Sequence, residues 1–382
     1  MNRADKHSQI STVKSNLPQG WEVKTLGEVC KIIAGQSPES KYYNETESGL
    51  PFYQGKKEFS DKFIGAPVKW TTKITKEAVE GDILMSVRAP VGPVNFAIQK
   101  ICIGRGLASI RAGEEIDKEF LYNFLLKHKN EIVGNTGAVF NSINKTQIGN
   151  IEIPLPTFPE QQRIVAKLDQ VYAAIDKAKA NAEKNLENAK ELFESYLNGI
   201  FEEKGDDWEE EALGKCFRLK SGDGLVSRNM VLSGIYNVYG GNGIAGKHNM
   251  FNLYGNYVII GRVGALCGIA RNIDEKIWLT DNAFKIVDYK YDFDNHFLTY
   301  LLNYKYLRQF ARQAAQPVIS NSSLKEVKLC FPRSINEQNN IVCKLNVLSE
   351  EARKMEAIYQ QKIDELEELK KSILQKAFEG KL

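Results

Sequence analysis

The sequence predicts an α+β chain in which two β-rich bodies alternate with two long helices that pair as an antiparallel coiled coil, an internal pseudo-twofold repeat. Three observations predict it: matched motifs occur twice, short apolar runs are separated by turn signals, and two long segments carry heptads. The expected parts are a polar tail at 1–16, a body at 17–158, a helix at 159–204, a second body at 205–335 and a second helix at 336–382.

The duplication is seen in motifs that recur in the same order. Trp21 and Trp208 lie 187 residues apart, whereas the Glu-Gln motifs beginning at Glu160 and Glu337 lie 177 residues apart. Further matches are GDILMSVRAPVG (81–92) with GNYVIIGRVGAL (255–266), which aligns Arg88 with Arg262, then NSINKTQIGNIEIPLP (141–156) with VISNSSLKEVKLCFP (318–332), and ELFESYLNGIFEEK (191–204) with ELKKSILQKAFEGK (368–381). One structural unit is therefore expected twice.

Each copy begins with a segment rich in glycine and aromatic residues. Short apolar runs such as ILMSV (83–87) and YVIIG (257–261) alternate with the turn signals GQSP, SGLP, GGNG and SGDG. This pattern is typical of short strands joined by tight turns. Each body also has one segment with helical periodicity, at 117–130 and at 295–313.

Each copy ends in a long amphipathic helix. Apolar residues recur every seven positions at Leu168, Ile175, Ala182, Ala189 and Tyr196, and again at Leu345, Ala352, Tyr359, Leu366 and Ile373. So narrow a stripe favours a coiled coil, and each helix would span roughly 65–70 Å at 1.5 Å per residue. Antiparallel pairing would bury both stripes and hold the bodies at opposite ends. The alternative is that each helix packs only on its own body.

Composition limits the function classes. The net charge of +3 divides into +2 for residues 1–20, +1 for 21–158, −2 for 159–204, +3 for 205–335 and −1 for 336–382, so no part is a basic tail. No run of 18 apolar residues occurs and the N-terminus is polar, so a cytoplasmic protein without a membrane span is expected. The six cysteines form no Cys-x-x-Cys pair, and we expect buried free thiols rather than a metal site.

The partial catalytic motifs in this sequence lack the neighbouring residues that each type of site requires. GGNGIAGKH (240–248) contains a Gly-x-Gly-x-x-Gly pattern, but His248 stands where a P-loop needs Ser or Thr. A Rossmann turn would need a following helix and an acidic residue about 20 positions on, and the next carboxylate is Asp274. No nucleophile elbow, nuclease motif or amino-methylase loop is present, although residue order alone leaves a Ser-His-Asp triad open. The residues favour a binding protein over an enzyme.

The order and duplication of these motifs resemble those of the DNA specificity subunit of Type I restriction–modification enzymes. The resemblance covers residues 18 to 382 and rests on LPQGWEVKTLGEV (17–29), IPLPTFPEQQRIVAKLD (153–169), VYGGNGIAG (238–246), IIGRVGALCG (259–268), WLTDNA (278–283) and LEELKKSILQKAFEGKL (366–382). The second copy departs at 333–338, where RSINEQ replaces TFPEQ, inserts one residue and loses the proline before Glu337.

The resemblance implies a division of labour. Each body would be a target-recognition domain that reads one half of a bipartite site in double-stranded DNA, and the helices would set the spacer between the halves. Two modification subunits that bind S-adenosylmethionine would dock on the helices, and restriction subunits that use ATP and Mg would join them. This chain would hold no cofactor, no metal and no catalytic residue. The alternative from a different class is a coiled-coil scaffold with two β-rich protein-binding modules.

DNA recognition requires hydrogen-bonding side chains on loops for base edges, and Lys, Arg and backbone N–H groups for phosphates. For each candidate the alternative is a solvated or capping residue. Arg88 and Arg262 rank highest because both end apolar strands, and their alternative is an ion pair inside the domain. The candidates in the first body are Gln36, Ser37, Gln54, Lys56, Lys57, Ser86, Arg88, Arg105, Asn141, Ser142 and Asn144, and those in the second are Ser221, Asp223, Tyr239, Asn242, Lys247, Arg262, Thr280, Asp281, Asn282, Gln316, Ser320 and Asn321.

Overall fold

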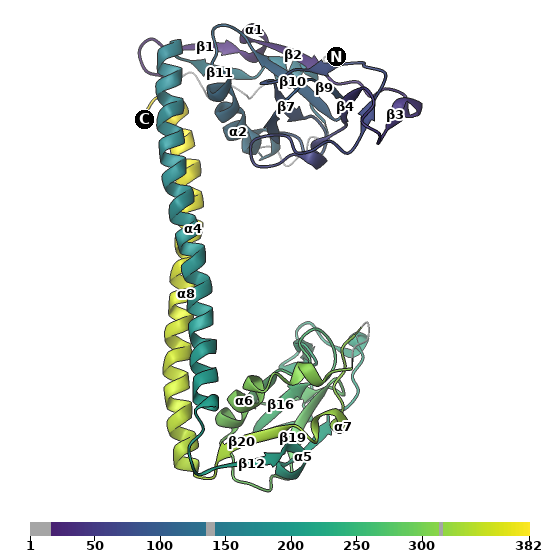
Figure 1. Ribbon diagram of the computed structural model, residues 1–382, viewed down its shortest axis with the longest axis vertical. Coiled ribbons are helices and arrows are strands. Elements are labelled where there is room, and N and C mark those ends of the chain that lie inside the picture. Colours follow the sequence, from purple (N-terminus) through teal and green to yellow (C-terminus); the bar gives the residue numbers. More distant parts are fainter. Residues whose placement is uncertain (1–16, 135–141, 313–315) are drawn as a thin grey trace, which may run out of the picture. The chain divides into compact units, whose positions relative to one another are not determined.

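The computed structural model describes residues 17–134, 142–312 and 316–382 (Figure 1). It divides into two compact units, Met1–Asn181 with Lys362–Leu382, and Ala182–Gln361. The long helices α4 (Phe158–Glu202) and α8 (Ile335–Phe378) each contribute one part to each unit. Each unit therefore combines one β-rich body with one half of the helix pair, and the α+β class with its internal repeat is confirmed.

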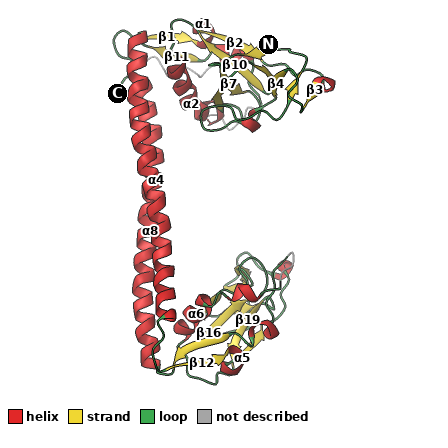
Figure 2. Cartoon of the chain, viewed as in Figure 1, coloured by secondary structure: helices red, strands yellow, loops and turns green. Residues whose placement is uncertain are grey.

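The first body centres on a four-stranded antiparallel sheet with the order β2-β10-β7-β8. Figure 2 shows the strands of both bodies in yellow. Strands β1 and β11 form a separate ladder where the chain enters and leaves the body, and a sheet of order β3-β5-β4-β9-β6 completes it. The bounds are β1 Glu22–Thr25, α1 Leu26–Val29, β2 Cys30–Ala34, β3 Tyr43–Asn44, β4 Leu50–Tyr53, β5 Trp70–Thr71, β6 Glu77–Ala78, β7 Ile83–Ser86, β8 Val94–Phe96, β9 Ile101–Ile103, β10 Leu107–Ala112, α2 Lys118–Gly134, α3 Lys145–Gly149 and β11 Glu152–Leu155.

The second body repeats this plan. The sheet β13-β19-β16-β17 corresponds to β2-β10-β7-β8, and the ladder β12–β20 corresponds to β1–β11, whereas a three-stranded sheet β15-β14-β18 replaces the five-stranded one. The bounds are β12 Trp208–Ala212, α5 Leu213–Cys216, β13 Arg218–Ser221, β14 Tyr236–Gly240, β15 Gly243–His248, β16 Asn256–Gly261, β17 Ala270–Asp274, β18 Ile277–Leu279, β19 Ala283–Val287, α6 Asn295–Tyr304, α7 Asn321–Leu324 and β20 Lys328–Pro332.

Helix α6 is shorter than the expected helix at 295–313, because it ends at Tyr304. The Asn303 amide near its end accepts from the Ala270 N–H at 2.9 Å and donates to the Ala270 carbonyl at 3.1 Å, which joins the helix to β17. Tyr306 then adopts the left-handed conformation at φ 44°, which breaks the helix and lets Leu307 enter the core. A tertiary contact overrides the local helical pattern here.

The two long helices run antiparallel in the first unit. Lys179 donates to Glu367 at 2.6 Å, and Lys370 donates to Asp176 at 2.9 Å, so later residues of α4 face earlier residues of α8. In the second unit the end of α4 and the start of α8 share one apolar cluster, which includes Phe201 and Leu345. The predicted antiparallel pairing is confirmed, and both helix ends also pack on their bodies.

The heptad phase changes along α4. The seven-residue series from Leu168 to Ala189 is buried as predicted, but Tyr196, the next member, is 47% exposed. Leu197 and Phe201 are buried instead, in the cluster that contains residues of α6 and α8. Here the helix packs against a body as well as a partner helix, so the four-residue spacing of a wider apolar face replaces the coiled-coil repeat.

The two long helices begin differently. Pro159 lies in the first turn of α4, where a missing N–H costs no helical hydrogen bond. In α8 Asn336 stands at the position of Pro159, and the Ser334 hydroxyl just before the helix accepts from the Glu337 N–H at 3.4 Å. The second copy therefore still begins its long helix in this segment, despite the inserted residue.

Three further features concern membrane-spanning helices, metal ligands and thiols. Within residues 17–134, 142–312 and 316–382, no helix is both long and apolar enough to cross a bilayer. The same described residues contain no group of His, Cys, Asp and Glu arranged to hold a metal ion. Four cysteines are buried and Cys30 is half-buried, whereas Cys343 is exposed on α8, contrary to the expectation for this thiol.

Candidate nucleic-acid interface

Candidates from three separate segments of the first body meet at one edge of its sheets. The Ser37 hydroxyl accepts from the Arg105 N–H at 3.1 Å, and the Gln54 carbonyl accepts from the Gly106 N–H at 3.0 Å. A Cβ atom at Gly106 would lie 2.3 Å from the Gln54 oxygen, so only glycine permits this approach. Gln36 precedes this contact, and Lys56 and Lys57 follow it in a short 3₁₀ helix. We call this set, Gln36, Ser37, Gln54, Lys56, Lys57 and Arg105, the first loop cluster.

Arg88 lies beside the first loop cluster. The Val87 N–H donates to the Gly106 carbonyl at 2.9 Å. Arg88 follows Val87 and Arg105 precedes Gly106, so this bond joins the two segments that carry these arginines. Arg88 also forms a β-bridge with Ser142. The side chains of Arg88, Arg105, Lys56 and Lys57 are all exposed. Four cationic groups at one sheet edge suit a phosphate backbone.

Two other candidates of the first body serve the domain itself. Ser86 is only 3% exposed, and its hydroxyl donates to the Arg88 carbonyl at 3.2 Å. Asn144 caps α3, since its side chain accepts from the Gln147 N–H at 2.9 Å while Gln147 accepts in return from the Asn144 N–H. Asn141 lies outside the described residues. Their contact with DNA stays a prediction.

The second body gathers its candidates at the corresponding edge. The Arg262 N–H donates to the Asn282 carbonyl at 2.9 Å, and the Thr280 N–H donates to the Tyr239 carbonyl at 2.9 Å. The Asp223 N–H, two residues after Ser221, donates to the Leu279 carbonyl at 3.0 Å. We call the set Ser221, Asp223, Tyr239, Arg262, Thr280, Asp281 and Asn282 the second loop cluster.

The side chains of this cluster differ in exposure. Those of Asp223, Asp281 and Asn282 are exposed, those of Ser221 and Arg262 are half-buried, and those of Thr280 and Tyr239 are buried.

Burial affects one side chain of the second loop cluster chemically. The Tyr239 hydroxyl donates to the Glu275 carboxylate at 3.4 Å. Desolvation, with the nearby Glu275 charge, raises the pKa of Tyr239 above its ordinary value. The phenol therefore stays protonated at neutral pH and keeps its role as a donor.

The remaining candidates of the second body lie around this cluster. Asn242 accepts from the Leu266 N–H at 2.9 Å, and Asn321 donates to the Leu219 carbonyl at 3.2 Å. Ser320 caps α7 by accepting from the Ser323 N–H at 3.1 Å, as Asn144 caps α3 in the first body. Lys247 on β15 and Gln316 are exposed. Asn144 and Ser320 thus share one structural role at equivalent positions.

The hydrogen-bond register corrects the sequence alignment of Arg88 with Arg262. In the first body Val87 donates to Gly106 and accepts from the Ile143 N–H at 3.0 Å. In the second body the residue with both equivalent bonds is Arg262, which donates to Asn282 and accepts from the Ile319 N–H at 2.9 Å. Arg262 therefore corresponds to Val87. A shift of one residue along a strand turns the side chain to the opposite face.

The different face explains the different surroundings of the two arginines. The Arg262 guanidinium lies 5.3 Å from the centre of the Phe284 ring, and its Nη1 donates to the Asp281 carbonyl at 3.3 Å. Its Nε is buried and has no hydrogen-bond partner among the described residues. Arg88 is exposed. Arg262 is thus partly structural, whereas Arg88 is free to reach a ligand.

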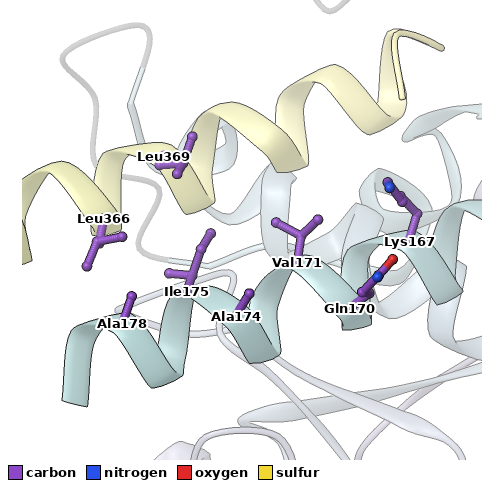
Figure 3. Close-up of a pocket in the computed structure, with 8 residues that line it drawn as sticks. All are labelled: Lys167, Gln170, Val171, Ala174, Ile175, Ala178, Leu366 and Leu369. Atoms are coloured by element: carbon purple, nitrogen blue, oxygen red, sulfur yellow. The ribbon is translucent and has the colours of Figure 1, made fainter. Parts of the chain in front are cut away.

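The helix pair carries an apolar groove in the first unit (Figure 3). It has a volume of about 390 Å³ and lies between α4 and α8. Leu369 on its α8 wall is 45% exposed. The groove is lined by Lys167, Gln170, Val171, Ala174, Ile175, Ala178, Leu366 and Leu369. An exposed apolar groove on a helix pair is typical of a protein-binding surface.

Two β-rich bodies with polar loops at equivalent sheet edges, joined by one helix pair, define a class of duplicated recognition scaffolds. A family model described as the Type I restriction modification DNA specificity domain matches residues 18–188 and, a second time, residues 205–368. The chain belongs to this family, as its motifs suggested. Each match covers one copy of the repeat.

Curated relatives are named as specificity subunits of type I restriction enzymes. The chain is 42% identical over 197 residues to the MjaX type I restriction enzyme specificity subunit of Methanocaldococcus jannaschii, an alignment that covers 50% of this chain and 45% of that protein. It is 23% identical over 419 residues to the MjaVIII specificity subunit of the same organism, covering 96% and 94%. Unlike this last alignment, those with the first three curated relatives span only about half of each relative's length.

Solved structures share the fold. A chain from a study of complex assembly and conformational transition of the type I restriction–modification system has a TM-score of 0.80 at 19% identity, covering 96% of this chain and 100% of that one. The HsdS subunit from Thermoanaerobacter tengcongensis has a TM-score of 0.62 at 19% identity, covering 97% and 99%.

Proposed function

We propose that this chain is the sequence-specific DNA-binding subunit of a Type I restriction–modification enzyme. Each body would read one half of a bipartite site, and the paired helices would set the spacer. The observation that carries this proposal is the duplicated loop cluster, which forms at equivalent sheet edges of two bodies joined by the same pair of helices. The first loop cluster with Arg88 offers cations for phosphates and the amides of Gln36 and Gln54 for base edges.

The chemistry of modification and cleavage would belong to partner subunits. Two modification subunits would bring S-adenosylmethionine, and restriction subunits would bring ATP and Mg. The apolar groove between α4 and α8 supports a docked partner, because it exposes Leu369 to solvent. The near-neutral charge of the chain supports DNA binding in a complex rather than by this chain alone.

We expect the purified chain to transfer no methyl group to DNA and to bind its site well only together with the modification subunit. Methyl transfer would be measured with S-adenosylmethionine and genomic DNA, with and without the modification subunit. Methylation mapping of genomes with and without the gene would identify the two half-sequences. Methyl transfer by this chain alone would contradict the proposal, and a complex that binds no DNA would favour the protein-binding scaffold.

The arginines on opposite faces of their strands predict different outcomes. Arg88→Ala should weaken binding of one half-site without changing thermal stability. A lost guanine contact would cost about 1–3 kcal/mol and relax one base position, whereas a lost phosphate contact would weaken all sequences and lower the salt slope by about one. Arg262→Ala should affect the other half-site and also destabilise its body by about 1–2 kcal/mol, because the ring contact with Phe284 is lost.

Binding to duplexes with mapped half-sites, at several salt concentrations, and thermal unfolding of both variants test this prediction. Unchanged affinity with lowered stability for Arg88→Ala would assign Arg88 a structural role instead.

A further inference from the structure

Gln161 in the first turn of α4 is completely buried and makes three hydrogen bonds to its body. Its Nε2 donates to the Glu115 carbonyl at 2.9 Å and to the Pro156 carbonyl at 2.9 Å. Its Oε1 accepts from the Asp117 N–H at 2.7 Å. Asp117 in turn caps α2, with its carboxylate accepting from the Phe120 N–H at 3.0 Å. One amide therefore connects the long helix, the residue that follows the last strand of the body and the start of α2.

Gln338 in α8 makes the same three bonds in the second unit, and it too is completely buried. It donates to the Asp292 carbonyl at 3.1 Å and to the Pro332 carbonyl at 2.9 Å, and it accepts from the Asp294 N–H at 2.8 Å. Asp294 caps α6 as Asp117 caps α2.

The arrangement survives the one-residue insertion between the copies. Pro156 lies five residues before its glutamine, whereas Pro332 lies six residues before Gln338. The connecting segment has absorbed the insertion, while the three bonds are retained. The three hydrogen bonds are thus the same in both copies although the connecting segments differ in length. We call each glutamine with its three bonds the joint of its unit.

Apolar packing alone would hold the body on the helices without a defined direction, because the hydrophobic effect is not directional. In the first unit Phe378 of α8 packs on Phe120 and Phe124 of α2, with ring centres 5.0 and 5.5 Å apart. Hydrogen bonds require both a distance and an angle. The amide of Gln161 therefore supplies the directional part of this joint, and its donors and its acceptor oxygen are all used.

We propose that Gln161 and Gln338 are positioning residues that fix the direction in which each body leaves its long helix, and that they thereby make the protein selective for one spacer length. The inference rests on the proposed function. A spacer longer by one base pair moves a half-site by about 3.4 Å and turns it by roughly 35°. A rigid joint rejects this change, whereas a joint without the amide bonds tilts and accommodates it.

The test uses the complex of the full chain with its modification subunit and synthetic duplexes that carry the mapped half-sites. The spacer is the mapped length or differs by one or two base pairs. For Gln161→Leu and Gln338→Leu, the affinity ratio between the mapped spacer and its neighbours should fall about five- to thirtyfold, the factor that one or two kcal/mol represents. The preferred bases in both half-sites should stay the same.

Ile101→Val is the matched control, because Ile101 is buried in an apolar cluster of the first body that contains no residue of α4 or α8. It should leave the affinity ratio unchanged. Gln161→Glu, which keeps the size of the side chain but turns a second oxygen toward two carbonyls, serves if the leucine variant does not fold. Spacer selectivity that matches the wild type in these variants, or falls equally in Ile101→Val, overturns the inference. A wild-type complex with no spacer preference would instead contradict the proposed function.

Discussion

Lengthening both long helices by seven residues, after Asn181 in α4 and after Gln361 in α8, is expected to widen the spacer of the recognised site by about three base pairs. Seven residues add about 10 Å of helix at 1.5 Å per residue, and B-DNA rises about 3.4 Å per base pair. Each position is the point at which its helix passes from one unit into the other. An insertion of one full heptad keeps the apolar series of each helix in phase.

The bases of both half-sites should not change, because neither loop cluster includes residues of α4 or α8. Overall affinity should fall, since three base pairs also turn the DNA by roughly 100°. Methylation mapping in the altered strain measures spacer and half-sequences together. The control is the same insertion in α4 alone, which displaces the register of the pair and should abolish methylation. Changed bases with an unchanged spacer would show that the helices do not set the spacer length.

Phe201→Ala is expected to destabilise the second unit strongly. Phe201 is 2% exposed near the end of α4, and its ring centre lies 5.0 Å from that of Tyr304, 5.7 Å from Phe297 and 6.1 Å from Trp208. Removal of a buried phenylalanine ring costs about 3–5 kcal/mol, and here it would free the second body from its helix. Recognition of one half-site should be lost with it.

Denaturant unfolding measures the loss, and hydrogen exchange in α6 assigns it to the second unit. Tyr196→Ala on the same helix is the control, because that side chain is 47% exposed and should change stability by less than about 0.5 kcal/mol. Equal destabilisation by both substitutions, or an effect confined to the first unit, would contradict the role of Phe201 as the contact between α4 and the second body.

Periodic features of this chain could be predicted because they repeat over many residues. The duplication and the heptads from Leu168 to Ala189 each rest on several matched positions, so one exception does not change the conclusion. The heptad prediction was wrong at Tyr196, because α4 packs there on the second body as well as on α8, and a different face of the helix is buried. The end of α6 at Tyr304 escaped prediction for the same reason, since Asn303 bonds to a distant strand.

The order of the parts, the two copies and the family could be predicted from residue types alone, because these features depend on a fixed order of residues along the chain. Which face each candidate presents depends on the folded structure. A shift of one residue in strand register places Arg262 over Phe284 and leaves Arg88 exposed. The folded structure also decided that Gln161 and Gln338 are buried and bonded to their bodies, because two of the three partners of each glutamine lie more than 40 residues away along the chain, beyond the reach of any local pattern.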